Sequence, residues 1–385
     1  MCLLLWITMA RKRILIVSGE PSGDLHASNL VSNLKALKPG LEFFGMGGRL
    51  SKNAGVEIDY DITAMALVGL AEVLKNIITV GKVFRGLLKK VDERPVDLAI
   101  LVDYPGFNLR LAGELKKRGI PVIYYISPQV WAWGRDRVKI IKKCVKKILV
   151  FFKFEEELYK TCGVDAGFVG HPLLDIVKVT AAKEDTLKKY SLDGKKRTVA
   201  LLPGSRSLEV KALLPVMASA ARLISKNIKD VQFVVSKHPG LPSGLYEDAI
   251  GDNNEIKMVE GNTYNMLNAS DFAVVASGTA TLETAIIGTP LIIVYRANLI
   301  TYILYHMVKT TRFLGLVNII ADKEVAPELL QYDMTPENIA GAVTERLSDG
   351  KKLAAMRDDL KSVASTLGSP GASLRAAQAI LPYLQ

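Results

Sequence analysis

Short apolar runs alternate with longer amphipathic stretches over most of the chain. Strands of a parallel sheet are buried on both faces and are apolar throughout, whereas the helices that cover them are apolar along one side. The pattern predicts strands at residues 14–18, 42–46, 98–102, 122–126, 148–152 and 166–169, and in the second half at 198–202, 232–236, 256–259, 272–276 and 291–295. We therefore expect an α/β protein with two parallel sheets.

A polar, lysine-rich segment, residues 178–196, separates the two series of strands and predicts a linker with a short helix. Gly170-His171-Pro172, just before it, is expected to end the first domain. A chain of 385 residues suits two domains better than one core. We predict Rossmann-like domains at residues 1–173 and 174–365, facing across a cleft at the carboxyl ends of their strands, where open α/β sheets bind ligands.

The segment 64–90 has a different pattern. Apolar residues recur at helical spacing, basic residues fall largely on the opposite side, and no acid lies between Val73 and Val91. This pattern predicts a helix lying on an anionic lipid surface, although a helix packed on the sheet has the same spacing. The stretch 64–71, apolar apart from Gly69, favours the membrane. The residues expected to contact acyl chains are Leu67, Val68, Leu70 and Leu74.

Composition excludes a disordered chain, because 49% of the residues are hydrophobic and 23% are charged. The net charge of +11 is mostly N-terminal, since residues 1–175 carry 26 Lys and Arg against 18 Asp and Glu. Residues 110–147 alone hold eleven basic residues and two acids. Such a surface suits nucleic acid, anionic lipid or a phosphorylated substrate, and it is also typical of an ordinary solvated face.

Neither a disulfide framework nor a metal site is predicted, because the three cysteines lack C-x-x-C spacing and the four histidines lack metal-ligand spacing. Scattered cysteines indicate a reducing cytoplasm. The apolar opening, residues 1–10, is followed rather than preceded by basic residues and is too short to span a bilayer. We expect residues 1–8 to be a start-site extension or a disordered tail, and no transmembrane helix elsewhere.

Two loops of the first half carry candidate chemistry. Residues 18–24, Ser-Gly-Glu-Pro-Ser-Gly-Asp, follow a strand and open a helix, and Asp24 either caps that helix or contacts substrate. No dinucleotide or P-loop fingerprint is present. Asp103 ends the strand at 98–102, which places a carboxylate where a general base would stand, although Asp before a Pro turn is also a common structural choice.

Two loops of the second half predict a nucleotide diphosphate site. Leu202-Pro203-Gly204-Ser205-Arg206 joins a strand to a helix, so backbone N–H groups and a guanidinium converge. Residues 276–280, Ala-Ser-Gly-Thr-Ala, open a helix that carries Glu283. This Glu either complements the helix dipole or holds ribose hydroxyls.

Seven strings occur in one order: residues 19–24, 103–108, 127–133, 168–172, 202–206, 277–283 and 317–318. On these strings the chain, from about Arg13 to its C-terminus, resembles the lipid-A-disaccharide synthase family. Ser-Pro-Gln-Val-Trp-Ala-Trp and Leu-Pro-Gly-Ser-Arg are together highly specific for it. Gly106 departs from the pattern, because some relatives carry an acid there. The departure removes one candidate base and favours Asp103.

The resemblance implies a GT-B fold and sugar transfer with inversion, without a metal or cofactor. It implies UDP-2,3-diacylglucosamine as donor, 2,3-diacylglucosamine 1-phosphate as acceptor, and a β-1,6-linked disaccharide phosphate and UDP as products. By motif, Asp103 is the expected base, with Glu20 and Ser22 near the reacting centre. The expected donor-binding residues are Gly204, Ser205, Arg206, Gly261, Gly278, Thr279, Glu283 and Asn318.

Family members form homodimers with exchanged C-terminal segments. Residues 366–385 are therefore expected to return to the first domain or to exchange with a partner protomer. The resemblance also implies a cytoplasmic protein attached to the anionic surface of the inner membrane. The D-x-D triplet 59–61 resembles the metal motif of the other main glycosyltransferase fold, but it lies outside the predicted nucleotide half.

Two rival hypotheses remain. Another nucleotide-sugar enzyme of the same fold, a UDP-N-acetylglucosamine 2-epimerase or the peptidoglycan glycosyltransferase, would share the second-half loops. A nucleic-acid-binding protein would instead use the basic tract at 110–147, in which Tyr124, Tyr125, Trp131 and Trp133 are interleaved.

Overall fold

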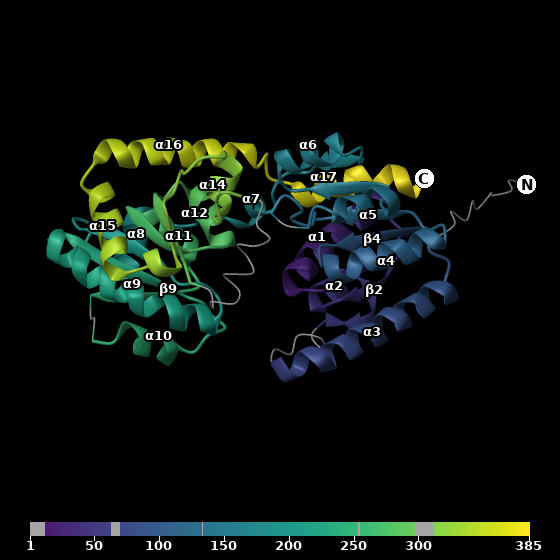
Figure 1. Ribbon diagram of the computed structural model, residues 1–385, viewed down its shortest axis with the longest axis horizontal. Coiled ribbons are helices and arrows are strands. Elements are labelled where there is room, and N and C mark those ends of the chain that lie inside the picture. The colour runs from purple at the N-terminus through teal and green to yellow at the C-terminus, as the bar shows by residue number, and fades with distance from the viewer. Residues whose placement is uncertain (1–11, 63–69, 133, 253–254, 297–310) are drawn as a thin grey trace, which may run out of the picture. The chain divides into compact units, whose positions relative to one another are not determined.

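The computed structural model describes residues 12–62, 70–132, 134–252, 255–296 and 311–385, with the backbone alone for residues 70–78. The chain divides into two compact units (Figure 1). Unit 1 consists of residues 1–172 and 369–385, and unit 2 of residues 173–368. Each unit contains one parallel sheet, so the two parallel sheets predicted from the apolar runs are confirmed.

The sheet of unit 1 has the strand order β3-β2-β1-β4-β5-β6-β7, with every neighbouring pair parallel. Its central strands, β1 and β4, are almost wholly buried because apolar side chains fill both faces. The strands are β1 Arg13–Ser18, β2 Glu42–Gly47, β3 Val56–Asp61, β4 Leu98–Val102, β5 Val122–Tyr125, β6 Lys147–Val150 and β7 Ala166–Phe168.

Helices cover this sheet, and the last helix of the chain belongs to unit 1. The helices are α1 Pro21–Leu37, α2 Arg49–Asn53, α3 Leu70–Glu93, α4 Pro105–Lys117, α5 Arg137–Cys144, α6 Lys153–Thr161, α17 Ala372–Ile380 and the 3₁₀ helix η3 Leu381–Leu384. Helix α17 packs against α1. Lys38 Nζ donates to the Leu384 carbonyl at 2.7 Å, and Arg375 Nε donates to the Val169 carbonyl at 2.8 Å.

Helix α3 contains most of the segment for which we expected a membrane surface. Its second half packs on the core of unit 1: Leu87 is fully buried, and the Phe84 ring lies edge-on to Phe107 with 5.3 Å between centroids. This half therefore favours the alternative of a helix packed on unit 1, and contact with a membrane stays a prediction. Leu67 and Val68 lie outside the described residues, as do the side chains of Leu70 and Leu74.

The sheet of unit 2 has the order β10-β9-β8-β11-β12-β13, again with every neighbouring pair parallel. Its strands are β8 Arg197–Leu202, β9 Val231–Lys237, β10 Ile256–Glu260, β11 Phe272–Ala276, β12 Leu291–Tyr295 and β13 Glu328–Leu330. The described helices are α7 Leu173–Ile176, α8 Lys183–Lys189, α9 Ser207–Asn227, α10 Ser243–Ile250, α11 Thr263–Ala269, α12 Thr279–Ile287, α14 Leu316–Ala321, η2 Gln331–Asp333, α15 Pro336–Leu347 and α16 Gly350–Thr366. Helix α8 is the short helix predicted in the linker.

The sequence pattern missed two strands, β3 and β13. Both lie at a sheet edge, and in neither is the run continuously apolar. The residues of the D-x-D triplet belong to β3, where Asp59 Oδ1 lies 3.6 Å from Arg94 Nη2. Asp59 is thus paired with a guanidinium inside unit 1.

Candidate functional site

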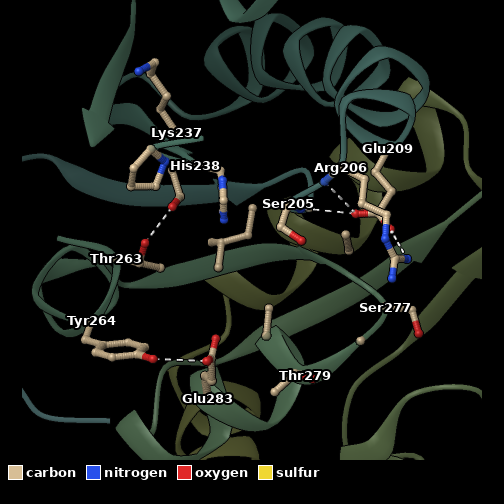
Figure 2. A pocket seen from close by; sticks show the side chains of 17 residues that line it. Ser205, Arg206, Glu209, Lys237, His238, Thr263, Tyr264, Ser277, Thr279 and Glu283 are labelled. Carbon is tan, nitrogen blue, oxygen red and sulfur yellow. Dashed lines mark hydrogen bonds and ion pairs between the residues drawn. The ribbon is translucent and has the colours of Figure 1, made fainter. Parts of the chain in front are cut away.

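A cavity of about 540 Å³ opens in unit 2 at the carboxyl ends of β8, β9 and β11 (Figure 2). Three loops of this sheet edge contribute to it, together with the first residues of α9, α11 and α12. Of the predicted donor-binding residues, the lining contains Gly204, Ser205, Arg206, Gly278, Thr279 and Glu283. The structure therefore brings both predicted phosphate-type loops to one pocket.

The loop after β8 leads into α9 through a glycine whose position no larger residue fits. Gly204 has φ +105°, and a Cβ there would lie 2.3 Å from Glu209 Oε2. Arg206 is the N-cap residue of α9, and its side chain is 81% exposed. The loop thus presents backbone N–H groups and an exposed guanidinium at the start of a long helix, a favourable place for an anion.

The loop after β11 leads into α12 through Gly278, which has φ +150°, and a Cβ added there would meet no atom within 4 Å. No acidic residue occupies the first turn of α12, so its N-terminal N–H groups and dipole face the pocket without a competing carboxylate. This helix end and the loop before α9 line the same cavity. Together they suit the charge of a diphosphate.

Glu283 lies in the second turn of α12 rather than the first, so complementing the helix dipole does not explain it. Tyr264 Oη donates to Glu283 Oε1 at 3.1 Å, as Figure 2 shows. Burial raises the pKa of Glu283, and the hydrogen bond from Tyr264 opposes that rise. A partly buried carboxylate with one oxygen held by a hydroxyl leaves its other oxygen to accept from a ligand.

The residues that sequence reasoning missed in this pocket end or follow β9, or begin α11. They are Ser236, Lys237, His238, Pro239, Thr263 and Tyr264, and Glu209 joins them from α9. His238 Nδ1 accepts from the Gly240 N–H at 3.1 Å, so the neutral ring carries its proton on Nε2. Their position could have indicated this group, because β9 is the parallel neighbour of β8 and the two strands end at the same edge of the sheet.

Two predicted donor-binding residues do not line the cavity, Gly261 and Asn318. Asn318 is fully buried. Its amide nitrogen donates to the Ala326 carbonyl and to Glu328 Oε1 at 2.6 and 2.9 Å, and its oxygen accepts from the Val325 and Ala326 N–H groups at 2.8 and 2.9 Å. All four hydrogen-bonding positions are used within unit 2, so in this structure Asn318 braces the β13 region and does not point toward a nucleotide.

In unit 1, Asp103 and Glu20 stand at the ends of adjacent strands, since β1 pairs with β4 and Ser18 is opposite Val102. Asp103 and Tyr104 both have φ +48°, a left-handed conformation that is costly for residues other than glycine. Asn108 Nδ2 and Tyr124 Oη each donate to the Asp103 carbonyl at 2.7 Å and hold this turn. These hydrogen bonds hold the backbone of Asp103 in an unfavourable conformation and thereby fix the direction of its side chain.

Burial and, to a smaller extent, the negative charge of Glu20 raise the pKa of Asp103 to about 6, while the Tyr104 N–H opposes the rise. Glu20 is the exposed N-cap residue of α1, and Ser22, also exposed, is the second residue of that helix. A carboxyl with a pKa near neutrality at a strand end is suited to accept a proton.

Asp24 has a structural position. Its Oδ1 accepts from the N–H groups of Gly48 and Ser51 at 2.8 and 3.1 Å, and its Oδ2 accepts from Leu50 at 3.0 Å. The expectation that Asp24 caps its own helix is therefore wrong, because its carboxylate accepts from N–H groups at the start of α2. Asp24 is buried and is therefore not a candidate base.

The tryptophan motif folds around a buried carboxyl. Trp131 Nε1 donates to Glu155 Oε1 at 2.9 Å, and burial raises the pKa of Glu155 to about 7. Tyr124 and Tyr125 are fully buried, and Trp131 is nearly so, while Trp133 lies outside the described residues. Buried rings do not stack on bases, so these three aromatic residues give no support to a nucleic-acid surface.

Among the described residues, no three His, Cys, Asp or Glu side chains form a group that would hold a metal ion. No helix in the described ranges has the length and apolar character needed to cross a bilayer.

Comparisons with known proteins agree with this geometry. A family model described as lipid-A-disaccharide synthetase matches residues 14–381. The chain is 45% identical over 379 residues to the lipid-A-disaccharide synthase of Syntrophus aciditrophicus, which spans 98% of this chain and 99% of that relative. It is 42% identical over 373 residues to the lipid-A-disaccharide synthase of Myxococcus xanthus, with 97% of both chains covered.

Solved structures show a similar fold at low identity. A UDP co-structure of MnaA from S. aureus has a TM-score of 0.63 at 16% identity, with 97% of both chains covered. The calicheamicin glycosyltransferase CalG4 has a TM-score of 0.60 at 14% identity, with 98% of this chain and 99% of that chain covered. These likenesses concern the fold alone, and they confirm the GT-B fold expected from the sequence.

Proposed function

This chain belongs to the lipid-A-disaccharide synthetase family, and from that premise we propose that it transfers 2,3-diacylglucosamine from UDP to 2,3-diacylglucosamine 1-phosphate. The transfer forms a β-1,6-linked disaccharide phosphate, inverts the sugar carbon and releases UDP. Family membership favours this reaction over the 2-epimerase and the peptidoglycan glycosyltransferase.

The observation that carries the donor half is the cavity of unit 2, because it gathers Arg206, the amino end of α12 and Glu283. In the proposal, Arg206 and the N–H groups before α12 bind the diphosphate, and Glu283 accepts a hydrogen bond from the ribose. These donors neutralise the departing UDP without a metal ion.

Asp103 supports the acceptor half. A primary hydroxyl is a poor nucleophile at neutral pH, so it gains from a carboxylate that takes its proton. Asp103 is ionised at pH 7, since its pKa is raised only to about 6. Glu20 and Ser22 lie beside this strand end, from which they would contact the acceptor sugar.

The direct test incubates the purified protein with both acylated sugars, in excess chelator, and follows disaccharide and UDP by mass spectrometry. Arg206→Ala is expected to weaken UDP binding, measured by calorimetry, and to slow transfer. Arg222→Ala is the matched control, because Arg222 is an exposed arginine of the same helix outside the cavity. Failure to form disaccharide, or restoration of turnover by magnesium, contradicts the proposal.

Association with an anionic membrane surface is the second part of the proposal. It is supported by the apolar stretch 64–71 and by the basic excess of residues 110–147. Replacing Leu67, Val68 and Leu70 by Ser is expected to release the protein from anionic vesicles. Leu208→Ser is the control, because Leu208 is a large apolar side chain that is 78% exposed in unit 2. If the triple variant unfolds instead, the stretch belongs to the core.

A homodimer with exchanged C-terminal segments stays a prediction from the family. Within the described chain, α17 packs on α1 of the same chain. Sedimentation velocity of the full chain, compared with a chain ending at residue 368, measures the oligomeric state and the contribution of this helix. A full chain that sediments as a monomer contradicts the prediction.

A further inference from the structure

Glu209 occupies the phosphate-type loop with its own carboxylate. Its Oε2 accepts from the N–H groups of Ser205 and Arg206 at 3.1 and 3.3 Å, and its Oε1 lies 3.2 Å from Arg206 Nη1 (Figure 2). These two amides and this guanidinium belong to the loop before α9, which lines the cavity proposed to bind the donor diphosphate. An anion of the protein therefore sits where an anion of the substrate is expected.

The Glu209 carboxylate packs closely against the backbone of the loop. Gly204 has φ +105°, and a Cβ there would come within 2.3 Å of Glu209 Oε2 and 2.9 Å of Glu209 Cβ. The Glu209 side chain is 21% exposed, whereas that of Arg206 is 81% exposed. The carboxylate is thus held against the backbone of the loop, while the guanidinium that contacts it remains free to turn toward solvent or a ligand.

The charges that line the cavity determine how the Glu209 contact affects an entering anion. Its described lining has two cations, Arg206 and Lys237, and two anions, Glu209 and Glu283, so the formal charges cancel. Lys237 Nζ is already 2.9 Å from Glu260 Oε2. A diphosphate that enters while Glu209 keeps its position meets occupied donors and a nearby negative charge.

We infer that Glu209 is a placeholder for the donor diphosphate: UDP displaces its carboxylate from Ser205 and Arg206, and the carboxylate returns as UDP leaves. This inference rests on the proposed function, because it takes UDP as the ligand of the cavity. Because the Glu209 carboxylate competes for the same donors, it weakens the binding of UDP. When UDP leaves, the carboxylate bonds again to the N–H groups of Ser205 and Arg206. Glu209 acts through Arg206 and the loop and is a positioning residue.

The test compares UDP binding by the purified wild-type protein and Glu209→Gln. Glu209 is the third residue of α9, and its side chain caps the start of this helix. Glutamine keeps a carbonyl oxygen for the two amides but loses the charge, so this cap is retained. The variant is expected to bind UDP about two- to fivefold more tightly, on the scale of one exposed ion pair, and to release UDP more slowly in stopped-flow measurements. Glu209→Ala, which removes the competitor altogether, is expected to shift affinity in the same direction.

Two further measurements separate competition from a structural effect. The affinity ratio between the variant and the wild type is expected to shrink as salt is raised, because screening weakens the repulsion between Glu209 and the diphosphate. Glu337→Gln is the matched control: Glu337 is an exposed acid in the first turn of α15 that does not line the cavity, and its removal is expected to leave UDP affinity unchanged.

Equal or weaker UDP binding by Glu209→Gln, with the fold retained in circular dichroism, overturns the inference and makes Glu209 a support for the loop. That result leaves the proposed function intact as long as the wild type binds UDP. If neither protein binds UDP, the proposed function fails, together with the inference that rests on it.

Discussion

Glu20 and Asp103 extend from the ends of two adjacent parallel strands, and the charge of Glu20 adds to the burial that raises the pKa of Asp103 to about 6. A carboxylate with a raised pKa is a stronger base than an ordinary aspartate, and at pH 7 it is still mostly ionised. The pair therefore provides a general base with a pKa near neutrality without using a histidine. Asp24, on the helix that follows Glu20, is already bonded to three backbone N–H groups.

Turnover is expected to depend on pH through Asp103. The base works only when ionised, so kcat/KM should rise with pH through about 6 and level off above it. Glu20→Gln removes a charge that raises this pKa, so the acid limb of the profile should move to lower pH. The measurement is kcat/KM between about pH 4.5 and 8 for both proteins, the range over which such carboxyls titrate. An unshifted profile would mean that Glu20 does not act on the base.

Asp103→Asn keeps the shape of the side chain but removes the base. Turnover is expected to fall by about 10²-fold or more, while UDP affinity by calorimetry stays close to that of the wild type. Asp136→Asn is the control, because Asp136 is an acid of unit 1 whose side chain is 91% exposed. Near-normal turnover by Asp103→Asn would reduce Asp103 to a turn residue and leave Glu20 as the leading candidate base.

The hydroxyl of Tyr264 is expected to matter for nucleotide binding because it holds Glu283. Tyr264→Phe leaves one oxygen of a partly buried carboxylate without its donor and removes the contact that opposes a rise in the pKa of Glu283. UDP affinity should fall by about tenfold, the scale of one lost charged hydrogen bond. Tyr190→Phe is the control, because the buried Tyr190 hydroxyl has no partner among the described residues. Equal losses in both variants would contradict a specific role for Tyr264.

The sheets followed directly from the sequence because buried parallel strands are continuous apolar runs. Strands β4, β11 and β12 begin and end at the predicted residues. Strand β3 was missed because polar residues alternate along an edge strand, and β13 because three residues give too short a pattern.

The candidate site was found only where a loop motif marked it. Gly204, Arg206 and Gly278 stand out because glycine and arginine at strand ends have a direct chemical interpretation. Tyr264 and His238 carry no such mark, since a single aromatic residue at the start of a helix, or a single histidine in a loop, belongs to no regular spacing or motif. Asn318 is the reverse case, because the family resemblance predicted it as a nucleotide ligand. In the folded unit its amide is bonded to Val325 and Ala326 instead.

Asn318→Ala is therefore expected to act first on stability. The substitution removes four hydrogen bonds and leaves the N–H groups of Val325 and Ala326 without their partner, while Glu328 still accepts from the N–H groups of Leu314 and Gly315. Unsatisfied buried groups of this kind cost about 1–3 kcal/mol each at most, and partial repair by water lowers the sum, so a loss of about 2–4 kcal/mol is expected.

The measurement is urea unfolding of the wild type and of Asn318→Ala, paired with UDP calorimetry under conditions where both proteins are folded. A lower unfolding midpoint with UDP affinity changed by less than about threefold fits a brace, because that shift is under about 1 kcal/mol. Asn338→Ala is the control, since Asn338 is an exposed asparagine of the same unit. Unchanged stability together with a large loss of UDP affinity would instead place Asn318 in direct contact with the nucleotide, as the family resemblance implies.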